Sequence, residues 1–492
     1  MLSVEEIKAF IDNDRASDNK EQARVSQRYY DGEHDILDKR IFFINADGKF
    51  QEDPTKTNTR ISHPFYRVLV DQTVQYIMSG EGKYIKSDDP ELQKELDARF
   101  NDNEDFTAEL YDVLEGCVKK GAEYAYGYKD ENGRTTFECA DSLGVIEVRE
   151  KDTDDGCAYV INYYTDRIDK NSKEIRRIEV WDDTQTYFYC QVDDGEITVD
   201  DSVKLNPRPH TIYRKKGDKR LYYKGFGHIP FYRLEYNRKR ESDLKLIKDL
   251  IDDYDVHACS LSNNLEDTNE ALYVVKGFEG DDLDELMFNI KAKKHVGVDE
   301  GGGVDVQTVD IPVEARKTKM DIDEKAIYKF GFGLDTAELK DTSATVSIAI
   351  KAAYSLLDLK AHKLKIKLHQ FLRKLINVTL EEINNEKGTD YTQSDVYFEF
   401  EPQIPTNEQE KAQIELLEAQ RRQTEINTLL MLTTKLDNET VMQQICEQLD
   451  ISYEEIKDKL PPPEDMNDPY QASSILNTLP TEPDDGGDVI AE

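Results

Sequence analysis

Residues 241–266, with the sequence ESDLKLIKDLIDDYDVHACSLSNNLE, constrain the fold more than any other stretch. Their apolar positions are spaced alternately by three and four residues, which predicts one long helix with a heptad stripe. The opposite face is acidic. A single stripe on a helix of this length must pack on something long, and two interpretations remain open: the core of a globular domain, or a helix in a bundle or ring. The stripe comprises Leu244, Ile247, Ile251, Tyr254, Ala258, Leu261 and Leu265, and the acidic face comprises Asp249, Asp252, Asp253 and Asp255.

Beyond this helix the chain makes a small insert and returns. Residues 271–275 and 304–309 have the pattern of strands, and residues 283–290 that of a short helix. Pro312 stands at a plausible first position of a second helix that runs to about residue 330. The sequence therefore predicts an outward helix, a compact β-α-β module and a returning helix.

The N-terminal side combines helices with a later strand-rich region. Helical periodicity covers residues 4–30 and 58–80, and two more helices are expected in residues 90–127, the second spanning residues 106–126. From about residue 134 to 236, short runs of Val, Ile, Tyr and Phe alternate with turn residues, which predicts an antiparallel layer. Helices followed by strands indicate an α+β fold.

On the C-terminal side, a polar loop over residues 334–344 precedes a very long helix from 345 to about 384. Its central part, residues 351–374, is strongly basic within an acidic protein, and it is either a solvated face or a contact with an acidic neighbour. A short strand at 396–401, two or three helices in 407–459 and a mobile acidic tail from 461 complete the prediction. The basic residues are Lys351, Lys360, Lys363, Lys365, Lys367, Arg373 and Lys374.

Composition excludes several functional classes. The 492 residues contain 64 Lys and Arg against 102 Asp and Glu, a net charge of −38, which argues against a surface that wraps phosphates tightly. The sequence contains no P-loop, GxSxG, HExxH or GxGxxG motif, and no CxxC pair among its six cysteines. We therefore expect no enzyme activity, no cofactor, no metal site and no membrane span.

The order of elements resembles the portal proteins of tailed bacteriophages, in the branch typical of long-tailed phages of Gram-positive hosts. None of the stretches that carry the resemblance is catalytic, but their order along the chain is specific. They are residues 29–36 (YYDGEHDI), 58–66 (NTRISHPFY) with 70–72 (VDQ), 225–231 (GFGHIPF) with 242–252 (SDLKLIKDLID), 310–317 (DIPVEARK) and 353–361 (AYSLLDLKA).

The resemblance implies a ring, usually of twelve subunits, at one capsid vertex of the virion, with double-stranded DNA passing through its channel independently of sequence. It also implies a protein made in the host cytoplasm whose partners are the terminase large subunit, the head–tail adaptor, and the major capsid and scaffolding proteins. The implied parts are a wing (1–240), stem helix 1 (241–266), a clip (267–310), stem helix 2 (311–332), a tunnel loop (333–345), a long wing helix (346–385), a crown (386–460) and an acidic flexible tail (461–492).

Three sets of residues follow from this map. We expect stem contacts between subunits at Ile247, Ile251, Tyr254 and Leu261, and a DNA-facing tunnel loop at Lys340, Glu338, Asp341 and Thr342. The expected partner contacts of the clip are Phe278, Glu279, Asp281, Asp282, Asp284 and Glu285.

The acidic composition fits a channel, because an acidic lining repels DNA from the wall and lets it slide. Two alternatives remain. One is another virion ring or an acidic α+β scaffold protein without a DNA channel. The other is an acidic metal-dependent nuclease, for which the sequence offers no compact trio of carboxylates on adjacent strands.

Overall fold

A computed structural model gives the architecture of the chain, which divides into two compact units, residues 1–344 with 348–404, and residues 345–347 with 405–492. In the first unit the structure describes residues 1–45, 47–53, 56–80, 83–130, 133–149, 156–168, 173–213, 222–267, 272–276, 303–307, 312–335 and 348–400. In the second it describes 347, 420–429, 431, 441 and 443–446.

The N-terminal helices differ from their predicted bounds. Helix α1 (Val4–Arg15) begins with a capping box at Ser3, and a break at Ser17 separates it from α2 (Asp18–Tyr30). Residues 58–64 form neither helix nor strand, so α3 is confined to Phe65–Met78. Three further helical segments follow, α4 (Pro90–Leu96), η2 (Asp97–Asn101) and α5 (Glu104–Lys120).

The helix predicted over residues 106–126 was too long. Gly121 adopts φ 94°, a left-handed conformation that ends α5, and the chain turns directly into β4 (Ala122–Lys129). A Cβ atom on Gly121 would lie 2.3 Å from the carbonyl oxygen of Arg240, so the close approach of the 236–240 turn also requires glycine.

The predicted antiparallel layer is confirmed as two sheets. The larger has the order β10-β9-β8-β7-β6, with β11 also paired to β9, and the smaller has the order β14-β4-β5. The larger sheet comprises β6 (Val145–Val148), β7 (Tyr159–Ile168), β8 (Glu174–Trp181), β9 (Gln185–Val192), β10 (Thr198–Val199) and β11 (Arg208–Pro209), and the smaller adds β5 (Thr135–Ala140) and β14 (Phe231–Glu235) to β4. Four two-stranded pairs are β1–β2 (Phe42–Ile44, Phe50–Glu52), β12–β13 (Thr211–Tyr213, Tyr222–Lys224), β15–β16 (Leu272–Lys276, Gly303–Gln307) and β17–β3 (Tyr397–Phe398, Ile85–Lys86).

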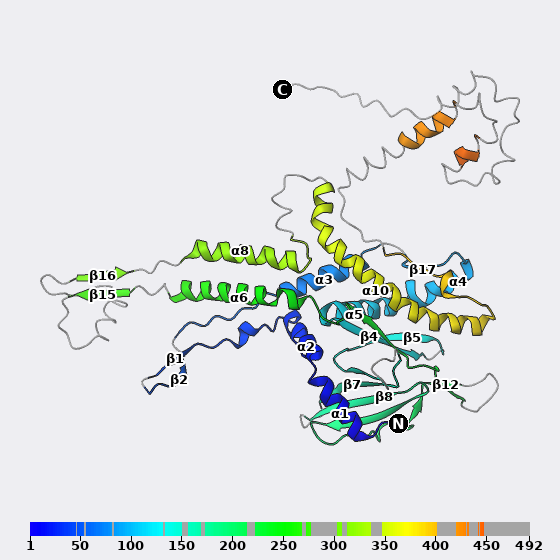
Figure 1. Ribbon diagram of the computed structural model, residues 1–492, viewed down its shortest axis with the longest axis horizontal. Coiled ribbons are helices and arrows are strands. Elements are labelled where there is room, and N and C mark those ends of the chain that lie inside the picture. Colours follow the sequence, from blue (N-terminus) through cyan, green and yellow to red (C-terminus); the bar gives the residue numbers. More distant parts are fainter. Residues whose placement is uncertain are drawn as a thin grey trace, which may run out of the picture. The chain divides into compact units, whose positions relative to one another are not determined.

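Three clusters of buried side chains hold these layers together. The main core joins α3, α5 and α10 (Ser347–Lys387) to one face of the smaller sheet, through residues such as Leu114, Leu234 and Phe371. A second core packs α1 against the larger sheet, and a third, around Trp181, lies between the two sheets (Figure 1). The α+β class is confirmed.

The outward helix, the two strands of the insert and the returning helix also form as predicted. Helices α6 (Leu244–Asp267) and α8 (Val313–Phe330) lie side by side, and the antiparallel hairpin β15–β16 lies between them in sequence (Figure 1). Pro312 is the residue before the first turn of α8 and not its first helical position. The short helix predicted at 283–290 lies outside the described residues.

Candidate functional site

The buried face of α6 follows a different line from the predicted stripe. Ile247 and Ile251 are 0% exposed, but the next fully covered residues are Asp255 and Cys259, at 0% and 1%. The four residues are spaced by four, which places them along one ridge of the helix. The prediction that Asp255 lies on the face opposite the buried stripe was therefore wrong, and Leu265, assigned to the stripe, is 49% exposed.

Asp255 is bound by two histidines from the N-terminal region. Its carboxylate lies 2.6 Å from Nδ1 of His34 and 2.7 Å from Nδ1 of His63, and it accepts a third hydrogen bond, of 3.0 Å, from the backbone N–H of His63. Nε2 of His34 faces the carbonyl oxygen of Tyr29 at 3.2 Å, and the two rings stack at 4.4 Å. Burial alone raises the pKa of a carboxyl group, but the histidine hydrogen bonds outweigh it and lower the pKa of Asp255 below its ordinary value.

An extended segment, residues 59–63, runs along the same ridge. Every second backbone N–H donates to a side chain of α6, and the acceptors recur every four residues. Two residues of extended chain span about 6.6 Å and four helical residues about 6 Å, so the two repeats match. The bonds run from Thr59 N to Asn263 Oδ1 at 2.7 Å, Ile61 N to Cys259 Sγ at 3.3 Å and His63 N to Asp255 Oδ1 at 3.0 Å.

A charged network continues toward the start of α6. Lys248 lies 2.6 Å from Asp252 and 2.7 Å from Asp35, and its Nζ sits 4.9 Å from the ring centroid of Tyr29. The Tyr29 hydroxyl donates to Asp252. We call the contacts of α6 with residues 29–35 and 59–63 the α6 clamp. It joins three of the stretches that carried the family resemblance, at 29–36, 58–66 and 242–252.

Helix α8 is tied to α6 along its length and to α3 at its C-terminal end. Lys319 of α8 pairs with Asp253 of α6 and with the buried Asp323 of its own helix. At the end of α8, Cβ atoms on Gly331 and Gly333 would lie 2.5 and 2.1 Å from the buried Leu69. These glycines serve close packing against α3, and neither has a positive φ.

Gln72 of α3 fixes the start of the following loop. Its Oε1 accepts from Leu334 N and its Nε2 donates to Leu334 O, both at 2.9 Å. The VDQ stretch of the resemblance thus holds the point at which the chain leaves α8.

Two lysines of the basic segment bind acidic residues of the same chain. Lys360, 6% exposed, pairs with Asp243 at 2.8 Å and donates to the carbonyl oxygen of Gly331, and Lys367 pairs with Glu235 at 2.6 Å. Lys363, Arg373 and Lys374 are exposed. Both interpretations of the basic segment therefore hold, at different positions of α10: Lys360 and Lys367 contact acidic residues, and Lys363, Arg373 and Lys374 face solvent.

The structure brings together only part of the predicted site residues. Lys340, Glu338, Asp341 and Thr342 lie outside the described residues, and so do Phe278, Glu279, Asp281, Asp282, Asp284 and Glu285. Tyr254 is partly buried between His63 and Phe65, and Leu261 is partly exposed. Ile247 and Ile251 contact the chain's own core and offer no surface to a neighbour.

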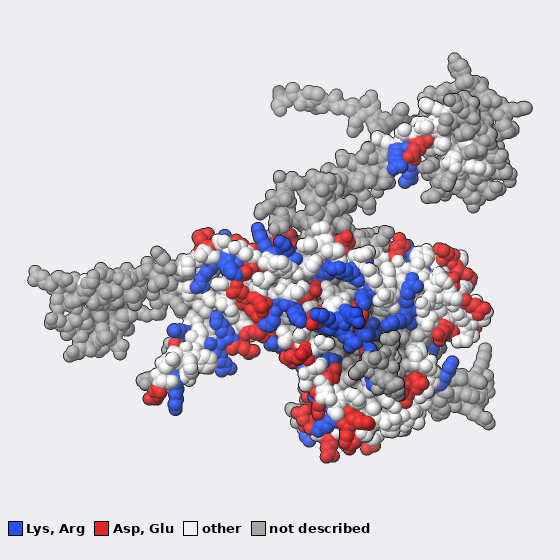
Figure 2. Space-filling model, viewed as in Figure 1, with Lys and Arg blue, Asp and Glu red and all other residues white. Residues whose placement is uncertain are grey.

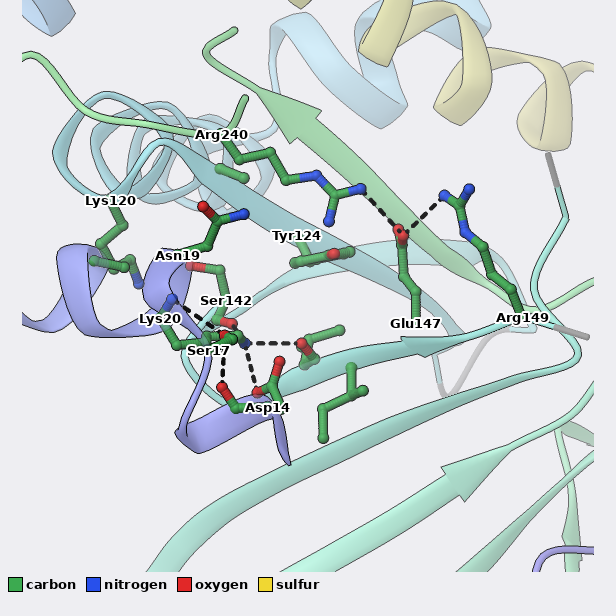
Figure 3. A pocket seen from close by; sticks show the side chains of 14 residues that line it. Asp14, Ser17, Asn19, Lys20, Lys120, Tyr124, Ser142, Glu147, Arg149 and Arg240 are labelled. Carbon is green, nitrogen blue, oxygen red and sulfur yellow. Dashed lines mark hydrogen bonds and ion pairs between the residues drawn. The ribbon is translucent and has the colours of Figure 1, made fainter. Parts of the chain in front are cut away.

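A cavity of about 240 Å³ lies between α2, β4 and β6 (Figure 3). On one side Lys20 contacts Asp14 at 3.1 Å and the carbonyl oxygen of Val145 at 3.0 Å. On the other, Glu147 lies between Arg149 and Arg240, at 3.2 and 3.6 Å. Ion pairs thus occupy both ends of this cavity.

The described part of the chain contains no group of three or more His, Cys, Asp or Glu placed to hold a metal ion. All six cysteines are free. None of the described helices has both the length and the hydropathy of a membrane span.

The long helices α6 and α8 are therefore held to the rest of the chain by the α6 clamp and by the packing of residues 331–334 on α3. Sequence reasoning missed the α6 clamp, although a carboxylate placed four and eight residues beyond two buried isoleucines is a signal for it.

Sequence comparison relates this chain to known proteins. The family model described as phage portal protein, SPP1 Gp6-like, matches residues 10–455. The portal protein of Bacillus phage SPP1 is 30% identical over 374 residues, covering 76% of this chain and 72% of the relative. The portal protein of Clostridium phage phiCD119 is 26% identical over 410 residues, covering 77% and 82%.

Proposed function

Because the chain belongs to the SPP1 Gp6-like family of phage portal proteins, which are head–tail connectors, we propose that it closes into a ring whose channel passes double-stranded DNA during packaging and ejection. The ring stands at one capsid vertex and numbers twelve subunits, as is usual in the family. The observation that carries this assignment beyond the family is the anchored pair α6 and α8 with hairpin β15–β16 between them.

The parts of the ring are assigned as follows. Residues 1–240 and 346–385 form the wing, residues 241–266 and 311–332 the stem, with most of α6 and all of α8, and residues 267–310 the clip. Residues 333–345 form the tunnel loop, 386–460 the crown and 461–492 the tail. The α6 clamp makes the stem rigid with respect to the wing, so force on the clip reaches the capsid without bending the base of α6.

Exposed apolar side chains support stem contacts between subunits. Leu246 on α6 and Ile322 and Phe330 on α8 are 61%, 58% and 51% exposed in the single chain. Exposed apolar groups that gather on one element commonly mark a protein interface. We assign the inter-subunit stem contacts to these positions together with Leu261 and Tyr254.

The clip carries the contacts to the terminase large subunit and later to the head–tail adaptor. Replacing residues 278–285 by a Gly/Ser linker is expected to leave ring assembly intact and to abolish motor binding in a pull-down, because the replaced segment holds six contact residues. Replacing the exposed Phe42 and Phe43 of hairpin β1–β2 by serine is the control, which keeps motor binding. Unchanged motor binding by the linker variant would remove the clip assignment.

The tunnel loop contacts DNA through Lys340, the one basic residue in 333–345. One lysine per subunit makes a belt of positive charge that touches phosphates without reading sequence. We expect Lys340→Glu to slow packaging severely while rings still form and the motor still hydrolyses ATP, measured as DNA length packaged per minute. Lys340→Arg, which keeps the charge, is expected to package normally. A normal packaging rate for the glutamate variant would exclude Lys340 as a DNA contact.

The major capsid and scaffolding proteins are assigned to the wing surface, since they surround the portal vertex. A pull-down with capsid protein, comparing wild-type rings with rings that carry Asp12→Lys and Glu21→Lys at exposed positions of α1 and α2, tests this assignment. Equal binding by both would move the capsid contact away from α1 and α2.

A further inference from the structure

The two free edges of the smaller sheet carry opposite charge. Its strand order is β14-β4-β5, so β14 and β5 are the two outer strands among the described residues. Helices α5 and α10 both pack on its core face. Lys367 of α10 donates a hydrogen bond to Glu235 at the end of β14. Glu109 of α5 accepts a hydrogen bond of 2.6 Å from the backbone N–H of Cys139 on β5. Each edge is therefore built from one strand and the helix beside it.

The β14 edge is basic. The turn after β14 supplies three consecutive cations, and exposed lysines of α10 lie beside it. Lys and Arg side chains form a band across this face in Figure 2, over the region where Figure 1 draws α10 and β4. The basic edge comprises Arg149, Arg233, Arg238, Lys239, Arg240, Lys363, Lys367 and Lys374, against Glu147 and Glu235.

Three cations of this edge share one carboxylate. Glu147 pairs with Arg149 and Arg240 (Figure 3), and it also pairs with Arg233. Arg233 and Lys374 line a neighbouring cavity of about 700 Å³, together with Asp182 and Asp183. The described residues of this edge thus include more cations than carboxylates, in a protein whose net charge is −38.

The β5 edge is acidic. Asp105, Glu109 and Asp112 lie on one face of α5, and Glu138 lies on β5 beside them. Burial and repulsion by the other three carboxylates raise the pKa of Glu109. No Lys or Arg of the described residues lies within ion-pair distance of these four groups. We call them the acidic edge.

A ring built from identical chains needs two different surfaces that fit one another, because each subunit contacts one neighbour on either side. Charge complementarity between two such surfaces selects the partner and fixes its register. DNA is a poorer fit to the basic edge, because Glu147 and Glu235 stand among the cations and repel phosphate.

We infer that the acidic edge of one subunit docks on the basic edge of the next, so that the wing closes the ring through electrostatic contact between copies of this chain. This inference rests on the proposed ring and names the surfaces that join it.

The test exchanges charges between the edges. Lys363→Glu with Lys374→Glu reverses two exposed lysines of the basic edge, and Asp112→Lys with Glu138→Lys reverses two carboxylates of the acidic edge. Each double variant is expected to dissociate at protein concentrations at least tenfold higher than wild type in analytical ultracentrifugation. The quadruple variant, in which the charges are exchanged, is expected to regain at least half of the ring population.

The matched control is Lys8→Glu with Lys94→Glu, two exposed helical lysines outside both edges, which is expected to form rings like wild type. Fluorescence of Trp181, the single tryptophan, reports folding of each variant. If a reversed variant misfolds, the neutral pair Lys363→Gln with Lys374→Gln replaces it, with the same direction of effect. Wild-type rings are also expected to dissociate as NaCl is raised, because salt screens exposed charges.

The outcomes separate this inference from the function. A wild-type protein that never forms rings contradicts the proposed function itself. Wild-type rings together with intact rings in both reversed variants overturn the edge contact alone. If the variant Lys363→Glu with Lys374→Glu still forms rings but these rings lose their retained DNA, the basic edge binds nucleic acid. That result would also overturn the edge contact. The edge contact is also overturned if the quadruple variant forms no more rings than the folded double variants do.

Discussion

Asp255→Asn is expected to lower the free energy of unfolding by about 3 kcal/mol, because a fully buried carboxylate loses its charge while its donors stay buried. The asparagine amide group presents N–H toward one of the two histidines, which is itself a donor. Urea denaturation followed by circular dichroism measures the change.

The matched control is Asp249→Asn, on the exposed face of the same helix, which is expected to change stability by less than about 0.5 kcal/mol. Hydrogen exchange localises the effect, since the backbone N–H groups of Thr59, Ile61 and His63 all bind α6. Equal stability of the two asparagine variants would show that the α6 clamp does not hold the helix.

Glu382→Gln is the second change with a large expected effect. Glu382, near the end of α10, accepts hydrogen bonds from Arg99 at 2.6 Å, Lys129 at 2.5 Å and the Thr135 hydroxyl at 2.6 Å. Glutamine leaves Arg99 and Lys129 partly unpaired at a mostly buried site, so we expect a loss of about 3 kcal/mol at pH 7.

The pH dependence of this loss has a definite sign. Burial on its own raises the pKa of Glu382, but the hydrogen bonds from Arg99, Lys129 and Thr135 lower the pKa from 4.5 to about 2. A carboxylate with a depressed pKa contributes its full stability above its unfolded value and loses it as the pH falls through the folded value. The difference between wild type and Glu382→Gln is therefore expected to shrink between pH 4.5 and 2.

Thermal unfolding of both proteins over this pH range measures the difference. Glu381→Gln, at the exposed neighbouring position, is the control that removes a charge without removing these contacts. A stability difference that stays constant from pH 7 to pH 2 would contradict the assigned hydrogen bonds.

Local sequence patterns predicted the elements well wherever one periodicity dominates. The long helices, the antiparallel strands and the out-and-back path around residues 272–307 all follow from apolar spacing and turn residues. The end of α5 was missed because residues 122–126 are as compatible with a helix as with a strand. The left-handed conformation of Gly121 ends the helix, and the pairing of β4 with β5 and β14 makes residues 122–126 a strand.

The site was harder to predict, because its partners are far apart in the chain. His34 and His63 precede Asp255 by 221 and 192 residues, and no local pattern shows that they meet it. The heptad spacing of α6 gave the correct helix but the wrong face beyond Ile251, since an extended segment covers the ridge with hydrogen bonds in place of apolar contacts. Burial of Ile247 and Ile251 likewise depends on the packing of the whole main core.

Electron cryomicroscopy of the purified full-length protein tests the central claim most directly. The account predicts end-on views of a closed ring with an open central channel, in which α6 and α8 form the stem and the acidic edge of each subunit faces the basic edge of the next. Monomers, open filaments or closed assemblies without a central opening would contradict it.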